Sequence, residues 1–492
     1  MKRLFLSIAL LTALAAQAVQ VNSEAGSLES LITDNTITQL TITGAIDARD
    51  IHFIATQLPQ LATLDMSQAQ VAAYEGDEPV FQNEVAYAAN EIPATAFFGN
   101  TTLQSVTLPA TVTAVGKAAF SGCSQLAAIN GIDHLTTMGD YAFSATAIPA
   151  VSLTSATTQM GTGVFSRCPA LQSATVATAS LGEAAFKDCA ALAEVTIAAG
   201  VQEIGAEAFA GDRALTGVDI AAAPALAVIG EKAFMGSGIE QFPFEQCEQL
   251  TTLGMWAMAN TPLQAVNLPQ SVQEIGQGAF FYNTELQSVS LPQGYQEIAS
   301  YLLAGDNNVS SDVAIAEGVT TVGDYAFYNW DQIAQFVVPA SVNYIGTKAM
   351  AGMTGLTKAM SQATTVPELG DDVWAGVDQP SVPLTVPKGT EDAYKGAAQW
   401  QEFNIEAVKT GLDTPAASEA SVSARFEGTT LVITASDVIA RATVYAVNGA
   451  LLNEVAPGTT QASLETMNYS GNYYVVTVTL ADGTKRVLKL SR

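Results

Sequence analysis

The chain has 492 residues, of which 49% are apolar and 13% are charged. This length suits several globular units or one long solenoid, and beyond its first residues the chain is too polar to be a membrane protein. Its 19 Lys and Arg against 47 Asp and Glu give a net charge of −28. Nucleic acid and anionic lipid are therefore poor partners, because binding to phosphate groups relies on basic patches.

Residues 1–18 are predicted to be a secretory signal peptide. Lys2 and Arg3 precede an apolar run that ends near Ala16, and Ala16 and Ala18 form a small-x-small cleavage site after Ala18. The apolar run is shorter than the roughly 20 residues that cross a bilayer. We therefore expect no membrane-spanning segment in the mature chain.

Residues 19–84 are predicted to form an N-terminal cap and a divergent coil. A helix-like segment around 48–58 lies between two strand-like runs, and a polar insertion at 73–93 precedes the regular repeats. A stack of repeats needs such a cap, because its terminal coil has an apolar face without a neighbour.

Residues 85–362 contain a repeat with a period of 21–25 residues. The most regular position of the repeat is a Phe or its substitute, at Phe97, Phe120, Phe143, Phe165, Phe186, Phe209, Phe234, Met258, Phe280, Leu303, Phe327 and Met350. Each repeat also contains a short stretch of alternating apolar and polar residues, which is typical of a half-buried strand. A period in the low twenties predicts a β-rich leucine-rich-repeat solenoid of about twelve coils.

A glycine recurs four residues before the Phe position, where we expect a tight turn or a positive φ. The residue directly before the Phe is usually Ala, which lets neighbouring coils stack closely. The coils at 129–148, 239–263 and 289–309 depart from the pattern. In the last of these Ala299 replaces the glycine and Leu303 the Phe, so we expect a local distortion there.

The repeat resembles the BspA-like leucine-rich repeats of bacterial surface proteins, whose consensus is close to "LxxVxIPxSVxxIGxxAFxxCxxLxxV". The segment "SVQEIGQGAFFYNTELQSVSLP" at 271–292 is one of the copies. Members of that family are linked to adhesion to host matrix proteins and to other bacteria, so the resemblance implies a non-enzymatic, adhesive surface protein.

Residues 363–408 are predicted to be the C-terminal cap of the solenoid, with a strand followed by a short helix carrying Tyr394 and Trp400. Residues 409–422 are small, polar and Pro-containing, and are predicted to be a linker. Residues 423–492 are predicted to form a small β-sandwich, with hairpin turns at Asn448–Gly449 and Asp482–Gly483.

This last segment resembles the C-terminal sorting domain of the type IX secretion system, and the positions that agree are Gly471, Tyr473, Val475 and Lys489. The resemblance implies export across the outer membrane of a Gram-negative bacterium, to the medium or to the cell surface. The alternative is an accessory β-domain without a sorting role.

The sequence assigns no catalytic residue, metal site or cofactor. Its two histidines, His52 and His134, lie in the cap and in a variable part of a coil, and no nucleophile or phosphate-loop motif is present. Cys168 and Cys189 follow the Phe of adjacent repeats by three residues, as Cys123 does in its repeat, so this column holds either buried thiols or a Cys168–Cys189 disulfide.

Aromatic residues outside the consensus crowd the later coils, and exposed aromatics are typical anchors of protein contacts and of sugar stacking. The candidate ligand-binding residues are Phe281, Tyr282, Tyr301, Tyr325, Tyr328, Trp330 and Tyr344. The alternative is that several of them pack between coils. We therefore predict a secreted or surface protein that binds an extracellular protein or glycan. A structural spacer and an accessory glycan-degrading enzyme are the other possibilities, and no oligomeric state is assigned.

Overall fold

The computed structural model describes residues 17–491 except for 83, 221–224, 293, 307–314, 409–421, 428, 447–450, 466–472 and 482–484. The chain divides into two compact units, one up to Val408 and one from Lys409 onward. Residues 1–16 of the predicted signal peptide and nearly all of the predicted linker lie outside the described residues. The predicted signal-peptide boundary falls within the first strand, β1 (Ala18–Ser23).

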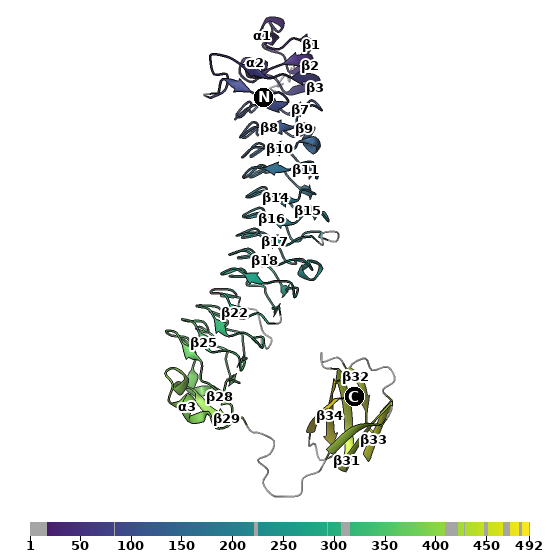
Figure 1. The fold of residues 1–492 in the computed structure, drawn as a ribbon, viewed down its shortest axis with the longest axis vertical. Helices are drawn as coiled ribbons and strands as arrows, with labels where there is room; N and C mark the ends of the chain where they lie inside the picture. Colours follow the sequence, from purple (N-terminus) through teal and green to yellow (C-terminus); the bar gives the residue numbers. More distant parts are fainter. Residues whose placement is uncertain are drawn as a thin grey trace, which may run out of the picture. The chain divides into compact units, whose positions relative to one another are not determined.

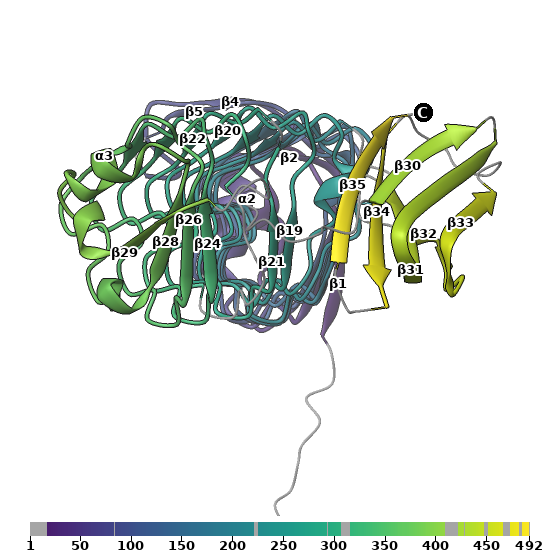
Figure 2. The same cartoon turned by 90° about the horizontal axis from the view of Figure 1, so that it is seen from below.

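The first unit is the predicted β-rich solenoid, whose coils follow one another along the stack (Figure 1). Most coils contribute one strand to each of two parallel ladders, and in a view along the stack β20 and β22 lie on one side of the coils and β19, β21, β24 and β26 on another (Figure 2).

The first ladder consists of four parallel sheets. Their strands are β1, β2 (Gln39–Ile46), β3 (Thr63–Val71), β7 (Ser105–Thr107) and β9 (Ala128–Asn130); β11 (Ala150–Leu153), β13 (Ser173–Val176) and β15 (Glu194–Ile197); β19 (Ala265–Asn267) and β21 (Ser288–Ser290); and β24 (Gln335–Val338), β26 (Lys358–Ser361), β28 (Pro383–Val386) and β29 (Asn404–Ala407).

The second ladder consists of three parallel sheets of two-residue strands. Their strands are β6 (Glu91–Ile92), β8 (Ala114–Val115), β10 (Thr137–Met138) and β12 (Gln159–Met160); β14 (Ser180–Leu181), β16 (Glu203–Ile204), β17 (Val228–Ile229), β18 (Thr252–Leu253) and β20 (Glu274–Ile275); and β22 (Glu297–Ile298), β23 (Thr321–Val322), β25 (Tyr344–Ile345) and β27 (Glu368–Leu369).

Short helices occupy the caps and three of the turns of this unit. They are α1 (Leu28–Leu31), α2 (Ala48–Gln57) and α3 (Glu391–Lys395), with 3-10 turns η1 (Ile132–His134), η2 (Phe244–Gln246), η3 (Gln379–Ser381) and η4 (Trp400–Glu402). The polar insertion after the N-terminal cap carries a small antiparallel hairpin of β4 (Tyr74–Glu75) and β5 (Ala86–Tyr87).

The Phe column runs through the centre of the coils. From Phe97 to Phe234 its rings stack nearly parallel, with centroids 5.1–5.7 Å apart in successive coils. All of these rings are at least 98% buried. Trp374 fills the same position in a further coil beyond Met350, so the repeat extends past the segment predicted from the sequence.

The recurring glycine serves the close approach of neighbouring coils. A Cβ at Gly139 would lie 2.5 Å from the backbone nitrogen of Lys117 in the preceding coil, and Gly116, Gly254 and Gly276 meet backbone atoms at 2.4–2.5 Å. None of these four glycines has a positive φ. The positive φ expected at this column is therefore wrong for these four glycines, and the structure gives close backbone contact between coils as the reason for them.

The positive φ values lie at two other columns, two residues before and two residues after the Phe. In the coil of Phe120 these residues are Ala118 (φ 52°) and Gly122 (φ 77°). Two left-handed residues around a buried ring make the tight turn of each coil, and their side chains point away from the core.

The predicted distortion at Ala299 coincides with an interruption of the second ladder. β20 and β22 belong to neighbouring coils but are not paired, whereas β18 pairs with β20 and β22 with β23. A groove of about 580 Å³ lies at this interruption, lined by residues 272–275, 294–297 and Ala299. The methyl group of Ala299 occupies the position where other coils need a glycine for close approach, which explains the separation.

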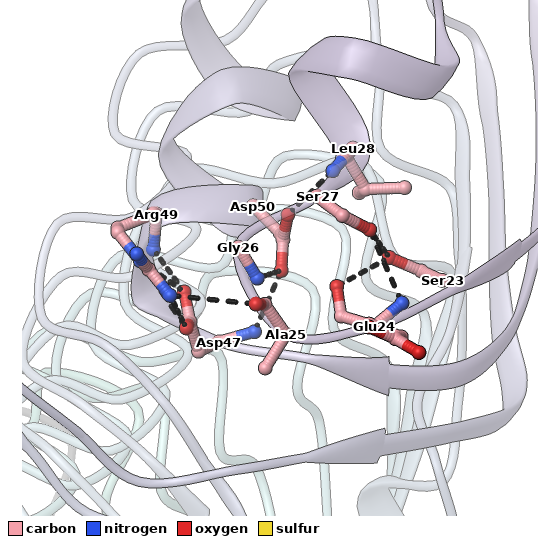
Figure 3. A network of polar contacts seen from close by, with 9 residues as sticks. All are labelled: Ser23, Glu24, Ala25, Gly26, Ser27, Leu28, Asp47, Arg49 and Asp50. Atoms are coloured by element: carbon pink, nitrogen blue, oxygen red, sulfur yellow. Dashed lines mark hydrogen bonds and ion pairs between the residues drawn. The ribbon is translucent and has the colours of Figure 1, made fainter.

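The N-terminal cap is held by a network of buried carboxylates (Figure 3). Asp50, which is 2% exposed, accepts hydrogen bonds from the backbone N–H groups of Gly26 (2.6 Å), Leu28 (2.9 Å) and Asp47 (2.9 Å). Asp47 caps α2 and pairs with Arg49 at 2.6 Å. One carboxylate thus ties the start of α1 to the start of α2, which fixes the first coil of the stack.

The C-terminal cap closes the other end through its aromatic residues. Tyr394 and Trp400 are almost fully buried. The Tyr394 hydroxyl donates to the carbonyl of Ala363 (2.9 Å), and the Trp400 indole N–H donates to the carbonyl of Pro367 (3.0 Å). Both residues therefore attach the cap to the segment that joins β26 to β27.

The second unit is one strongly curved antiparallel sheet. Its strands are β30 (Val422–Glu427), β31 (Thr430–Ala446), β32 (Leu451–Val455), β33 (Thr459–Glu465), β34 (Tyr473–Leu480) and β35 (Lys485–Ser491). The long β31 pairs with four other strands, and β30 lies close to β35, so the sheet folds over its own core and nearly closes. The predicted turns at Asn448–Gly449 and Asp482–Gly483 lie outside the described residues.

Changing Gly139 to Ala is expected to lower the free energy of unfolding of the solenoid by about 2 kcal/mol, because the new methyl group would collide with backbone atoms that cannot move independently. Gly200→Ala is the matched control, since a Cβ there meets nothing within 4 Å and should change stability by less than about 0.5 kcal/mol. Urea unfolding followed by circular dichroism measures both variants. Equal stability of the two variants would contradict the close-approach explanation.

Candidate functional site

Six aromatic side chains form a continuous row on the turns of the later coils. We call them the aromatic ridge: Trp256, Phe281, Tyr282, Tyr301, Tyr325 and Tyr328. Trp256, Tyr301 and Tyr325 occupy the left-handed position before the Phe column, with φ of 56–58°. The other three follow the Phe column by one or two residues. The turn geometry therefore directs all six side chains outward.

The rings of the ridge touch across coil boundaries. Trp256 meets Phe281 edge to face at 5.0 Å, and Phe281 meets Tyr301 at 6.4 Å. Tyr301 stacks on Tyr325 at 4.8 Å with an interplanar angle of 5°. Tyr325 then meets Tyr328 at 5.5 Å, and the Lys348 ammonium lies 5.9 Å from the Tyr325 ring centre.

Glycines in the following coils make room for two of these rings. A Cβ added at Gly278 would lie 2.5 Å from the Trp256 ring, and one added at Gly305 would lie 2.6 Å from the Tyr282 ring. Each ring thus lies flat over a glycine of the next coil. Tyr141 lies over Gly163 in the same way in an earlier coil, so the pairing of an aromatic with a glycine recurs along the stack.

The ridge exposes ring edges and phenol hydroxyls more than ring faces. Tyr301 stacks on one face of Tyr325, and the Lys348 ammonium lies 5.9 Å from the centre of the same ring. Tyr282 is 53% exposed, and Met255, next to Trp256, is 42% exposed. Partial burial raises the pKa of Tyr301, with smaller contributions from Tyr325 and Asp324, so this hydroxyl remains protonated at neutral pH. The surface therefore combines apolar edges with hydrogen-bonding hydroxyls.

The structure corrects the predicted set of binding residues at Trp330. This side chain is 1% exposed, its indole N–H donates to the carbonyl of Leu303 (2.6 Å), and its ring packs edge to face on Phe327 at 4.9 Å. Trp330 is therefore a core residue. Tyr344 is 37% exposed but lies on β25, away from the turn that carries the ridge. The other five predicted residues belong to the ridge.

Sequence reasoning missed Trp256. Its position in the repeat could have identified it. Trp256 precedes Met258 by two residues, just as Tyr301 precedes Leu303 and Tyr325 precedes Phe327. The exposed Phe98 was also missed; it is 64% exposed and lines a groove of about 740 Å³ together with His52 and Phe81.

The column three residues after the Phe is a buried row of small polar groups. The thiols of Cys123, Cys168 and Cys189 donate to the carbonyls of Phe97, Phe143 and Phe165, each in the preceding coil. In the other coils up to Asp306 the same position holds Asn, Thr, Ser or Asp, and in the next two coils it holds Trp330 and Met353. All four cysteines are buried and free in the structure, so the Cys168–Cys189 disulfide considered from the sequence is not formed there. Cys247 lies outside the column.

Asp212 brings a carboxyl group into this buried row. It is fully buried; its Oδ1 accepts the backbone N–H of Cys189 at 2.7 Å, and its Oδ2 has no hydrogen-bond partner among the described residues. Burial raises the pKa of Asp212 to about 9, and the nearby charge of Asp188 adds to the shift. Asp306 occupies the same column, and burial raises its pKa as well. Asp212 is therefore neutral at neutral pH, and the pKa shift of Asp306 has the same direction.

These buried acids predict that stability falls as the pH rises. Between the unfolded pKa of about 4 and the folded pKa of about 9, the folded state holds a proton at Asp212 that the unfolded state has lost, so each step up in pH favours unfolding. Asp212→Asn keeps the acceptor and cannot ionise. We expect a smaller loss of unfolding free energy between pH 5 and pH 9 in this variant, with the remaining loss due in part to Asp306.

Urea unfolding at pH 5, 7 and 9 measures this difference, with Asp371→Asn as the control at an exposed carboxylate in a later coil. A pH profile of Asp212→Asn that is parallel to that of the wild type would refute the assignment.

Other features of the described residues offer little for chemistry. A groove of about 830 Å³ lies where the first ladder is interrupted between β15 and β19, and Glu194, Asp219 and Glu245 line it. Within the part of the chain that the structure describes, no cluster of three or more His, Cys, Asp or Glu side chains is placed to hold a metal ion. His52 packs edge to face on Phe81, and His134 lies 3.3 Å from the carbonyl of Pro109.

No helix among the described residues is long and apolar enough to cross a membrane.

The stacked parallel coils and the buried Phe column define a leucine-rich-repeat solenoid. The repeat family described as "BspA type Leucine rich repeat region" matches residues 90–216 and 227–357 in six copies, which together make up just over half of the chain. The chain belongs to this family. No curated protein matches it.

Several solved structures are similar to the chain at low sequence identity. A leucine-rich repeat protein from Bacteroides ovatus is 18% identical, over 68% of this chain and 92% of that protein, with a TM-score of 0.48. A leucine rich cell surface protein from Faecalibacterium prausnitzii is 21% identical over 58% and 86% of the two chains, with a TM-score of 0.32. The pneumococcal vaccine antigen PcpA is 14% identical over 66% and 86%, with a TM-score of 0.37.

Proposed function

We propose that this protein is a non-enzymatic surface or secreted binder that captures an extracellular protein through the aromatic ridge. The observation that carries the proposal is the unbroken row of six rings on the exposed turns of consecutive coils. Tyr and Trp are the residues that most often anchor protein interfaces. Membership in a family of bacterial surface repeats supports an adhesive role.

Ring geometry favours a protein over a glycan as the partner. Sugar rings are bound by stacking on an open aromatic face, but Tyr301 and Tyr325 cover each other and Trp256 lies over Gly278. The accessible parts are ring edges, hydroxyls and the flexible side chains of Met235 and Met255, which are 36% and 42% exposed. Methionine and tyrosine together suit adaptable contact with another protein.

The ridge also supports a binder rather than a spacer. A large side chain at a left-handed backbone position is strained, and the same column accepts Ala118 and Ala184 in other coils. A protein that served only as a spacer would gain nothing from aromatic residues at these positions. A glycan-degrading enzyme would need a pair of carboxyl groups placed about a bound sugar, for which the ridge offers no equivalent.

Replacing Tyr301 and Tyr325 together with Ala is expected to weaken ligand capture at least ten-fold, because loss of an anchor ring costs about 1–2 kcal/mol or more. Binding of the full chain to immobilised extracellular-matrix proteins and to a glycan array measures the effect. The fold should persist, since alanine occupies this column in other coils. Tyr344→Ala, at a partly exposed tyrosine away from the ridge, is the matched control and should bind like the wild type.

The outcomes of this experiment separate the alternatives. Unchanged capture by the double variant would overturn the ridge as the site, and a wild-type chain that binds no member of either array would favour the spacer. Capture of glycans alone would overturn the preference for a protein. Trp330→Ala should instead unfold the chain, at a cost of about 3–5 kcal/mol, and therefore cannot report on binding.

We further propose that the chain is exported by a Gram-negative bacterium and that its C-terminal domain acts as a type IX sorting domain. Val475 and Lys489, two of the residues that carry the resemblance, are register partners on β34 and β35. Gly471 lies outside the described residues. A surface location is consistent with the acidic solenoid, since residues 19–408 contain 40 Asp and Glu but 10 Lys and Arg.

Cell fractionation with separate antibodies to the solenoid and to residues 423–492 checks this location. We expect the solenoid at the cell surface or in the medium, without the C-terminal domain, because sorting domains of this type are often removed or exchanged for an anchor. Retention of both parts together in the periplasm would reject the sorting role and make adhesion to external partners untenable.

A further inference from the structure

Two buried thiols occupy adjacent coils at the same column of the stack. Cys168 and Cys189 are both 0% exposed, and both follow the Phe of their coil by three residues. The Phe rings of these two coils, Phe165 and Phe186, are 5.7 Å apart and nearly parallel. The coils are therefore in regular register where the two cysteines face each other.

The spacing of adjacent coils suits a covalent bond between the two sulfur atoms. Neighbouring strands in a ladder are about 4.8 Å apart, and the Cα atoms of a disulfide are typically about 4.4–6.8 Å apart. Each of the two thiols is the largest single influence on the pKa of the other, lowering that of Cys168 and raising that of Cys189. The two sulfur atoms are thus direct neighbours.

The other two cysteines are not placed to compete. Cys123 belongs to the same column but is separated from Cys168 by the coil of Thr146, whose hydroxyl lies 3.3 Å from the Cys168 sulfur. Cys247 lies outside the column, with its sulfur 3.7 Å from the carbonyl of Pro243. Within the described residues the stack therefore offers one pair of cysteines in adjacent coils.

We infer that Cys168 and Cys189 are an oxidation site that forms a disulfide clamp between two coils when the chain folds in an oxidising environment, and that the structure shows the reduced state of this pair. In the reaction both thiols lose their protons, one S–S bond forms between the coils, and two electrons pass to an external disulfide, which is reduced to two thiols. The inference goes beyond the proposed binding function, and export would supply the oxidising environment.

Burial makes the clamp dependent on folding. Because both thiols are fully enclosed, an external disulfide reaches them while the coils assemble and not afterwards, and a reductant reaches the finished bond only after unfolding. We therefore expect the clamp to persist in the native protein under mild reducing conditions.

Refolding of the full chain in a buffer of oxidised and reduced glutathione tests the inference. This test does not depend on whether the protein is exported. The refolded chain is denatured in guanidinium, its free thiols are alkylated with N-ethylmaleimide, and its mass is measured by mass spectrometry. We expect two adducts, at Cys123 and Cys247, and four adducts if the chain is reduced before alkylation. Four adducts without reduction would overturn the clamp.

Peptide mapping identifies the bond, because trypsin cleaves after Lys187, between the two cysteines. The expected product is a linked pair of the peptides 168–187 and 188–213 that separates on reduction. Cys168→Ser should give three adducts, while Cys123→Ser should give one adduct and keep the linked pair. One adduct in Cys168→Ser would mean that Cys189 had paired with another cysteine, and this result would also overturn the assignment.

Discussion

The close approach of neighbouring coils is the constraint on which the rest of the solenoid depends. At the glycine column the backbones come so near that a methyl group would collide with the preceding coil, and in the centre the Phe rings stack about 5 Å apart. The two contacts act together, since the glycine sets the distance and the rings fill the interior at that distance. Where Ala299 interrupts the glycine column, the second ladder is interrupted as well.

The aromatic ridge is a consequence of the same turn. Each coil must reverse direction around a buried ring, and it does so with two left-handed residues whose side chains cannot enter the core. These positions accept almost any residue that can adopt a positive φ, because their side chains are not needed in the core. Their side chains can therefore form a binding surface. In the later coils they hold Trp and Tyr, and glycines in the next coil give two of the rings room to lie flat.

Charge is distributed unevenly between the two units. The C-terminal unit has seven acidic and seven basic residues, so the whole net negative charge belongs to the solenoid. An acidic surface keeps a long repeat stack soluble and separate from its copies. The aromatic ridge is an apolar patch on this negatively charged solenoid, as expected of a surface that contacts a partner.

Much of the architecture is local and periodic, so it could be read from the sequence. The Phe positions, the alternating strand segments and the aromatic residues of the C-terminal cap each follow from a pattern within one or two repeats, and the predicted β-rich solenoid is confirmed. Five of the seven predicted binding residues lie together on the ridge. Trp330 was predicted wrongly because its burial depends on the preceding coil, whose Leu303 carbonyl accepts its indole N–H; in its own coil it takes the position that holds a small polar group in earlier coils.

The sequence by itself determined the period, the residue that fills each coil and the columns in which glycine, cysteine and aromatic residues recur. Only the tertiary structure decided what each column does. The glycine column is a contact between coils. The left-handed positions could not be recognised from the sequence, because Ala, Tyr, Lys and Gly all occupy them. Trp256 belongs to the ridge because its ring contacts Phe281 and Tyr301 in later coils. The physical reason is that each of these roles is set by the coil above or below, and the stacking distance between coils is not encoded within any single repeat.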